Sequence, residues 1–137
     1  MKIIVFLFVL IHLSWGADAT IEVIKGVEGL SPLAIEDSSP QSTDMSQKFS
    51  QMLAADMNVV SLFNVDESYA MAGFDSIAPA PIHKEARYLL RYRLVNDGVG
   101  GVKADIKLLQ DNNPVFQKSY VLKQSEMLVF LAHSIAY

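Results

Sequence analysis

The residues best suited to acid–base or metal chemistry are the two histidines beyond the first 19 residues of the chain. His83 and His133 stand outside HExxH, HxH and the other spacings with which histidines share a metal ion. A metal ligand or a general base is therefore the weaker interpretation of either residue. We predict one histidine in a loop and one on a helix face, with no catalytic residue, no metal site and no cofactor.

Other motifs give enzyme chemistry equally little support. The chain has neither a G-x-S-x-G elbow nor an S-x-x-K pair. It has no cysteine, which excludes a cysteine nucleophile, a thiolate metal site, a disulfide scaffold and a bacterial lipobox. Gly98-Val99-Gly100-Gly101 lacks both phosphate-binding patterns and precedes a strand, so it is interpreted as a hairpin turn.

Basic residues recur at alternate positions in two predicted strands and could form a stripe on one sheet face. They are Arg91, Arg93, Lys103, Lys107 and, in a third strand, Lys118. Residues 20–82 carry two basic and nine acidic residues, whereas residues 83–137 carry eight and five. Because the neighbouring tyrosines alternate to the opposite face, nucleic acid is a poor match. We expect a solvated sheet face, or one docked on an acidic neighbour.

The first 19 residues read as an export signal. Lys2 precedes the apolar run Ile3–Ile11, and Ala17-Asp18-Ala19 is a small-x-small cleavage site. The run is too short for a membrane span, which needs about 20 apolar residues. We predict a signal peptide over 1–19, one domain over 20–137 and no membrane insertion after cleavage. An uncleaved anchor is the alternative.

Residues 88–122 predict a three-stranded antiparallel meander with one buried face, because apolar and polar residues alternate along each strand. A helix is predicted from Thr43 or Asp44 to Asn58, and a second one from Ser125 to Tyr137 with Ser125 as its N-cap. Shorter strands are expected at 33–35 and 59–65, with loops over 36–43 and most of 66–82. The second helical pattern is still running at Tyr137, so we expect the chain to be the front part of a longer protein.

The predicted strand at the mature N-terminus is the most informative segment. Thr20, Ile21, Glu22, Val23, Ile24 and Lys25 have strand chemistry, and Gly26 ends the run. Ile21 and Val23 share one face, with Glu22 and Ile24 on the other. Such a strand can pair within its own sheet, or it can add to the sheet edge of another protein. The residues alone leave both alternatives open.

Several short motifs, taken in order, resemble the TolB family of the Tol-Pal system. They are Ile21-Glu22-Val23-Ile24, Gly26-Val27-Glu28, Pro32-Leu33-Ala34-Ile35, Met52-Leu53-Ala54-Ala55-Asp56-Met57, Phe63-Asn64-Val65, Tyr92-Arg93-Leu94-Val95, Val115-Phe116-Gln117-Lys118-Ser119-Tyr120 and Ala132-His133-Ser134. Two features depart from the family pattern. Glu36-Asp37 stands where the family continues with an apolar residue or proline, and 66–86 has no clear counterpart.

The resemblance implies the fold and the function of the chain. The fold would be an α/β (α+β) domain, similar to anticodon-binding domains, with two helices packed on one face of a small mixed β-sheet. The function would be that of a non-enzymatic periplasmic interaction module in outer-membrane integrity, cell constriction and division, and protein or colicin import. A TolA-like protein would bind residues 20–26. Pal binds a propeller that follows this domain in the family, so Pal is not a partner implied for this chain.

Two other functions remain as alternatives. One is a stand-alone periplasmic accessory domain of a secretion or cell-wall machine. The other is a small periplasmic hydrolase that uses His83 or His133.

Overall fold

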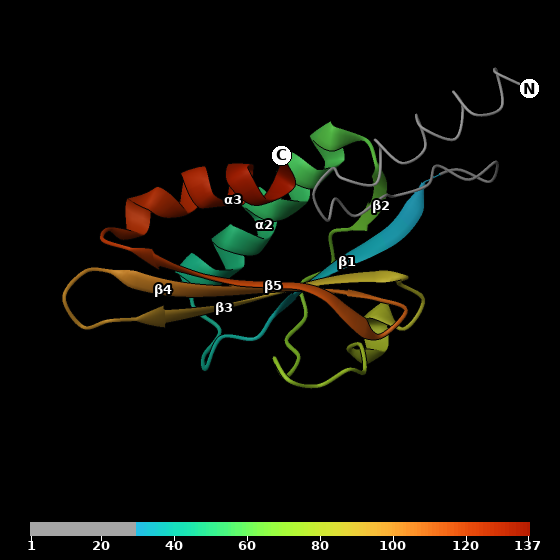
Figure 1. Cartoon of the computed structure of the whole chain (residues 1–137), viewed down its shortest axis with the longest axis horizontal. Coiled ribbons are helices and arrows are strands. Elements are labelled where there is room, and N and C mark those ends of the chain that lie inside the picture. Colours follow the sequence, from blue (N-terminus) through green and yellow to red (C-terminus); the bar gives the residue numbers. More distant parts are fainter. Residues whose placement is uncertain (1–29) are drawn as a thin grey trace, which may run out of the picture.

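The computed structural model describes residues 30–137, and the predicted signal peptide and the predicted strand at residues 20–25 lie outside this part. The described chain forms one five-stranded sheet and two α-helices (Figure 1). The elements are β1 (Ser31–Asp37), α2 (Asp44–Val60), β2 (Phe63–Asp66), the 3-10 helix η1 (Pro81–His83), β3 (Tyr88–Asn96), β4 (Val102–Gln110), β5 (Asn113–Leu122), the 3-10 helix η2 (Ser125–Met127) and α3 (Leu128–Ala136).

The sheet is mixed, as the resemblance implied. Its strand order is β2-β1-β3-β4-β5. β1 runs parallel to both of its neighbours, with α2 as the crossover to β2, whereas β3, β4 and β5 form the predicted antiparallel meander. The α/β prediction with a small mixed sheet is therefore confirmed.

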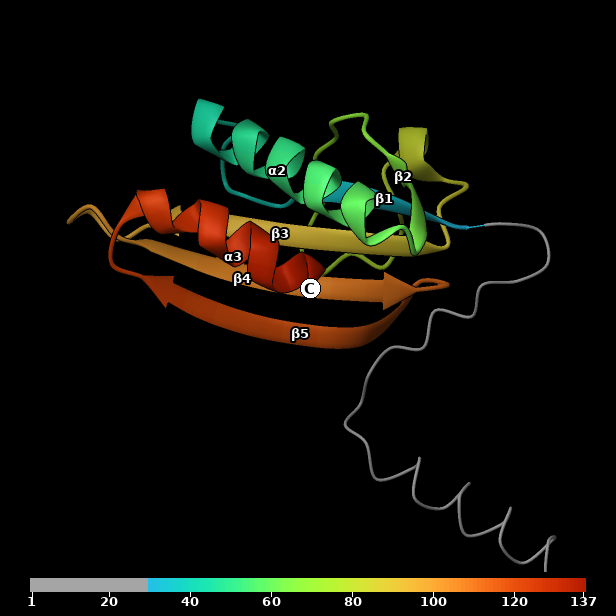
Figure 2. The ribbon, with the colours of Figure 1, turned by 90° about the horizontal axis from the view of Figure 1, so that it is seen from above.

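Both helices cover the same face of the sheet, which places the main core between them and the strands (Figures 1 and 2). Alternation along β3 turns Tyr88, Leu90, Tyr92 and Leu94 into this core. Phe49 of α2 meets the Tyr92 ring edge to face at 4.9 Å. The Tyr92 hydroxyl donates to the Ser46 carbonyl at 2.6 Å, which satisfies its buried polar end.

Of the two caps that the sequence allowed for the first helix, Thr43 and Asp44, the structure has Thr43 at the N-cap of α2. Its hydroxyl accepts from the Ser46 amide, and the Ser46 hydroxyl accepts from the Thr43 amide, which completes a capping box. The helix continues past Asn58, where the sequence predicted its end, and stops at Val60. Ser61 then takes the left-handed conformation at φ 60°, and its amide bonds to the Asn58 carbonyl.

The predicted loop after residue 35 is wrong at its first two residues. Glu36 and Asp37 belong to β1, where they pair with Arg91 and Tyr92 of β3. Both acidic residues are fully buried. The strand continues because Arg91 of β3 compensates the charge of Glu36, while the Tyr69 hydroxyl and the Ser39 amide donate to Asp37. Local polarity does not reveal these partners.

The chain between β2 and β3, residues 67–87, we name the strap; it first runs beside the end of β1, where Met71 bridges Asp37, and then crosses the sheet face opposite the helices (Figure 1). Most of it is loop, as predicted, apart from η1. The short helical turn that the sequence allowed near residues 70–74 is replaced by a single bridge between Asp37 and Met71. A small second core of Ala34, Leu89 and Leu109 packs under the strap with Ala86.

The last helix also begins later than predicted. Residues 125–127 form the 3-10 turn η2, α3 starts at Leu128, and Met127 holds its N-cap position. Ser125 is therefore not the N-cap of this helix. The buried residues Leu128, Leu131 and Ala132 nevertheless follow the predicted helical spacing into the core.

Candidate partner-binding surfaces

The residues predicted to bind a partner, 20–26, lie outside the described part of the chain, so the structure leaves their role as a prediction. The described residues contain two features that could support binding or chemistry. One is a buried charged cluster between sheet and strap. The other comprises the surfaces at the two edges of the sheet.

Glu36 is the centre of the buried cluster. One carboxylate oxygen, Oε1, accepts from Nε of Arg91 at 2.9 Å. The other, Oε2, accepts from the Ala80 amide at 2.7 Å and lies 3.0 Å from Nδ1 of His83. The side chains of Glu36, Arg91 and His83 are all completely shielded from solvent. A carboxylate buried to this degree needs such compensation, since an unpaired charge in the interior is costly.

Arg91 connects the sheet to the strap. Besides its ion pair with Glu36, its Nη1 donates to the Ser76 carbonyl, and its Nη2 donates to the Ala78 carbonyl at 2.6 Å. The guanidinium therefore has acceptors on both sides of the interface, which its planar fork of donors suits. Its position in mid-strand, opposite Glu36, makes Arg91 a structural residue.

His83 faces an acceptor at each ring nitrogen. Nδ1 lies 3.0 Å from Glu36, and Nε2 lies 3.0 Å from the Ser68 carbonyl oxygen. A carbonyl oxygen and an ionised carboxylate can only accept hydrogen bonds. This arrangement engages both ring nitrogens, so neither is left for proton transfer to a substrate. The sequence predicted a loop position for His83. The residue ends the short 3-10 helix η1 within the long β2–β3 connection, and it is buried with both ring nitrogens engaged.

The basic stripe is only partly solvated. Arg91 and Lys107 are buried under the strap, and the prediction of a solvated face is wrong for both of them. Phe74 lies between two cations, with Arg93 and Lys107 each 4.3 Å from its ring centre. The Lys107 ammonium donates to the Phe74 carbonyl at 2.7 Å. The other prediction, an acidic neighbour, is met within the chain by Glu36 for Arg91 and by Asp105 for Arg93.

Asp105 of β4 connects the side chains of the neighbouring strands β3 and β5 on the sheet face opposite the helices. It accepts from Arg93 at 2.8 and 3.0 Å and from the Ser119 hydroxyl at 2.6 Å. Burial alone would raise the pKa of Asp105, but the hydrogen bonds from Ser119 and Arg93 outweigh it, so this pKa lies below its ordinary value. Asp105 thus remains ionised and links three adjacent strands.

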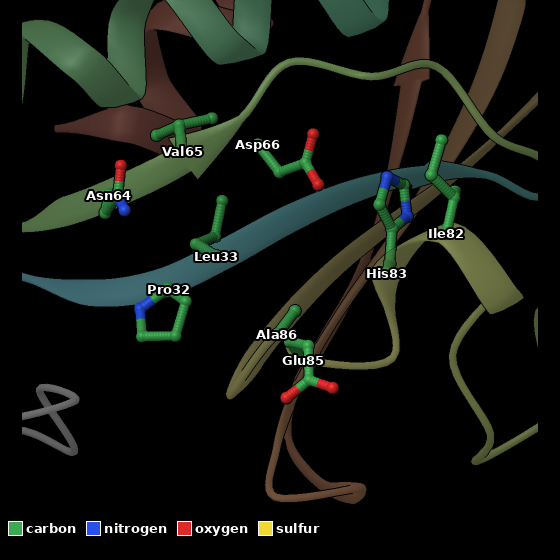
Figure 3. A pocket seen from close by; sticks show the side chains of 9 residues that line it. All are labelled: Pro32, Leu33, Asn64, Val65, Asp66, Ile82, His83, Glu85 and Ala86. Carbon is green, nitrogen blue, oxygen red and sulfur yellow. The ribbon is translucent and has the colours of Figure 1, made fainter.

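A pocket of about 320 Å³ opens at the β2 edge, between β1, β2 and η1 (Figure 3). Its polar lining includes Asn64, Asp66 and Glu85, and Pro32 and Leu33 contribute apolar surface. The Ser68 amide donates to Asp66 at 2.9 Å and holds the pKa of this carboxyl below its ordinary value. His83 also lines the pocket, but both of its nitrogens are engaged.

His133 lies on a helix face, as predicted. It is exposed on α3, and its Nδ1 is 3.8 Å from Asp56 of α2. His83 and His133 belong to opposite sides of the sheet, so the fold does not bring them together. Within residues 30–137 no group of three or more His, Asp or Glu side chains could hold a metal ion. No helix in that range is long and apolar enough to cross a membrane.

Sequence reasoning missed the role of Glu36 and Arg91, although one signal was available. Leu33-Ala34-Ile35 is apolar at consecutive positions, which is typical of a strand covered on both faces. A second cover was therefore required, and the 67–87 segment is the only long connection left to supply it within the described chain.

The described residues thus define a small α/β domain whose polar cluster supports its architecture, with both edges of its sheet at the surface. No protein-family model matches the chain. The chain is similar to the Tol-Pal system protein TolB of Wolinella succinogenes, with 30% identity over 141 aligned residues. The match covers 99% of this chain and 33% of that protein, so the chain spans about a third of the length of its curated relative.

Two solved structures align with most of the described chain. TolB from Acinetobacter baumannii aligns with a TM-score of 0.50 and 10% identity, covering 82% of this chain and 28% of that one. PelC from Paraburkholderia phytofirmans, solved as a dodecamer, aligns with a TM-score of 0.47 and 18% identity, covering 82% of this chain and 86% of that one. The resemblance found in the sequence is confirmed: the chain is similar to TolB over nearly its whole length, and a solved TolB shares its fold.

Proposed function

We propose that this chain is a non-enzymatic protein-interaction module of the bacterial periplasm that acts in a Tol-Pal-related envelope system. The observation that carries the proposal is the similarity to TolB over 99% of the chain. The geometry of the polar cluster supports it, because the acidic and basic groups buried there are engaged with one another. A role in envelope integrity and cell constriction follows from membership of such a system.

The partner in this proposal is a TolA-like protein, bound by strand addition through residues 20–26. Backbone hydrogen bonds would supply affinity, and alternate side chains would set the register. Ile21 and Val23 would enter pockets on one face of the added strand. The pattern of the segment and the family resemblance support this assignment. Pal is not proposed as a partner of this chain.

Deletion of residues 20–26 tests the partner site. Residues 1–19 are retained to direct export, and the protein is purified from the periplasm. We expect the shortened chain to keep its far-ultraviolet circular dichroism and its unfolding midpoint, and to lose binding to the TolA C-terminal domain in calorimetry. Full binding by the folded deletion variant would rule out this strand as the site.

A pair of point variants separates backbone pairing from hydrophobicity. Val23→Pro removes an amide donor and should weaken binding by at least about tenfold, because proline disrupts a strand ladder. Val23→Ile retains strand chemistry and should bind normally.

N-terminal sequencing of the exported protein tests the predicted signal-peptide cleavage, and Thr20 is the expected first residue. An N-terminus at Met1 would contradict the predicted cleavage.

A further inference from the structure

β5 forms one edge of the sheet and is long for an edge strand. Nine of its ten residues pair with β4, Val115 being left out at an irregularity, and among residues 30–137 no strand pairs with its other side. All residues from Asn113 to Ser119 are exposed. The β4–β5 register is irregular at Leu108 and Leu109, which leaves Phe116–Leu122 as a continuous regular stretch. Outward amides and carbonyls along such a stretch are a template for another strand.

Lys118 stands in the middle of this edge, where a lysine usually opposes pairing. Here its ammonium lies 5.1 Å from the centre of the Tyr120 ring. The charge is therefore held over an aromatic face of its own strand. A second strand could therefore pair with β5 while the Lys118 ammonium stays in place, provided that this strand carries an aromatic side chain opposite Lys118.

α3 adds apolar surface on the same side of the domain. Figure 2 shows α3 between α2 and the β5 edge. Val129 lines a groove together with Met45 and Met52 of α2, so this side of α3 faces α2. Phe130, one helical step of about 100° further on, turns away from α2 and is 73% exposed. Phe130 is therefore a solvent-exposed aromatic on the helix-covered side of the domain.

We propose that β5 pairs antiparallel with β5 of a second copy of this chain, about a two-fold axis at Ser119. The sheet would continue across both copies with all helices on one side, and the two α3 helices would approach each other near Phe130. This contact is isologous, so each copy must offer a self-complementary surface.

The sequence of β5 meets this requirement when Ser119 is central. Phe116 then faces Leu122 of the second copy, and Lys118 faces its Tyr120, as it already does within one chain. An axis at Lys118 would place two like charges directly opposite each other. An axis at Gln117 would place the irregular part of β5 around Val115 among the residues that pair between the two copies.

Single cysteines test this register without interference, because the chain has none of its own. In the proposed dimer the two Ser119 Cα atoms are about 4.5–5.5 Å apart, within the span of a disulfide. Ser119→Cys should therefore form a covalent dimer under mild oxidation, visible on a non-reducing gel. Ser119 gives a hydrogen bond to Asp105, so circular dichroism of the variant is compared with that of the parent chain.

Gln117→Cys is the matched control, since Gln117 is exposed on the same strand. In this register its two copies are four residues out of step, about 13 Å apart, and they should not cross-link. Cross-linking of Ser119→Cys alone supports the proposal. Cross-linking of Gln117→Cys to the same extent, or of neither folded variant, overturns it.

Sedimentation velocity of the unmodified chain gives a second measurement that needs no cysteine. The sedimentation coefficient should rise with concentration from that of a monomer towards that of a dimer. Phe130→Ser should raise the dimer Kd by about tenfold or more, because a buried aromatic is a typical hot spot. Val99→Ser, at an 87% exposed position in the β3–β4 turn, should leave the Kd unchanged. A monomer at every concentration up to about 1 mM would overturn the proposal.

Discussion

Glu36 and His83 are 47 residues apart in the sequence, yet Oε2 of Glu36 lies 3.0 Å from Nδ1 of His83 with both side chains fully buried. Glu36 comes from β1, whereas His83 comes from the strap. Together with Arg91 of β3, they fasten the long β2–β3 connection to the second face of the sheet.

Glu36→Gln should destabilise the domain by about 3–5 kcal/mol, because it leaves the Arg91 guanidinium buried without its counter-charge. The free energy of unfolding in urea, monitored by circular dichroism, measures this loss. Glu85→Gln changes an exposed carboxylate on the same strap and should shift stability by less than about 0.5 kcal/mol. Equal effects of the two substitutions would show that the buried cluster is not a major contributor.

Arg91→Lys should loosen the strap more than the helices. Lysine keeps the charge but lacks the planar fork that reaches Glu36 and the carbonyls of Ser76 and Ala78. We expect the Ala80 amide, which donates to Glu36, to exchange hydrogen at least about tenfold faster. Exchange in α2 should change much less. Arg87→Lys, at a half-exposed position, provides the comparison, and a strap equally protected in both variants would contradict the prediction.

Asp105 should contribute to the acid sensitivity of the fold. Its pKa is lowered in the folded state, so its contribution to stability is complete above its unfolded pKa of about 3.9. That contribution is lost as the pH falls through the lower folded value. Asp105→Asn should therefore reduce stability at pH 7 and flatten its decline below about pH 4. Urea midpoints between pH 7 and pH 2 measure this, and parallel curves for the two proteins would contradict it.

Thr43→Ala should cost about 1 kcal/mol, because it removes the side-chain oxygen that caps the first amides of α2. Thr43→Ser keeps that oxygen and should retain most of the stability. Thermal unfolding of both variants gives the comparison. If serine and alanine destabilise α2 equally, the capping box is not the reason for the threonine at this position.

Strong periodicity explains which elements could be predicted. Two local patterns in the sequence match the core of the structure. They are the alternating apolar residues of β3 and β4 and the apolar stripe of α2, formed by Phe49, Leu53 and Met57. Element boundaries were less accurate where a tertiary partner decided them. β1 extends through Glu36 and Asp37 because β3 supplies Arg91 and Tyr92 beside them. In isolation, two acidic residues after an apolar run favour a loop.

The sequence by itself determined the meander, the capped helix, the absence of cysteine chemistry and the resemblance to TolB, because each depends on residues close together in the chain or on composition. Only the tertiary structure decided that the stripe of Arg91 and Lys107 is buried, that His83 is fully engaged and that β5 forms an edge. The physical reason is that burial and ion pairing depend on which distant segments meet. Glu36 attracts Arg91 and His83 only after the sheet and the strap have brought the three side chains together.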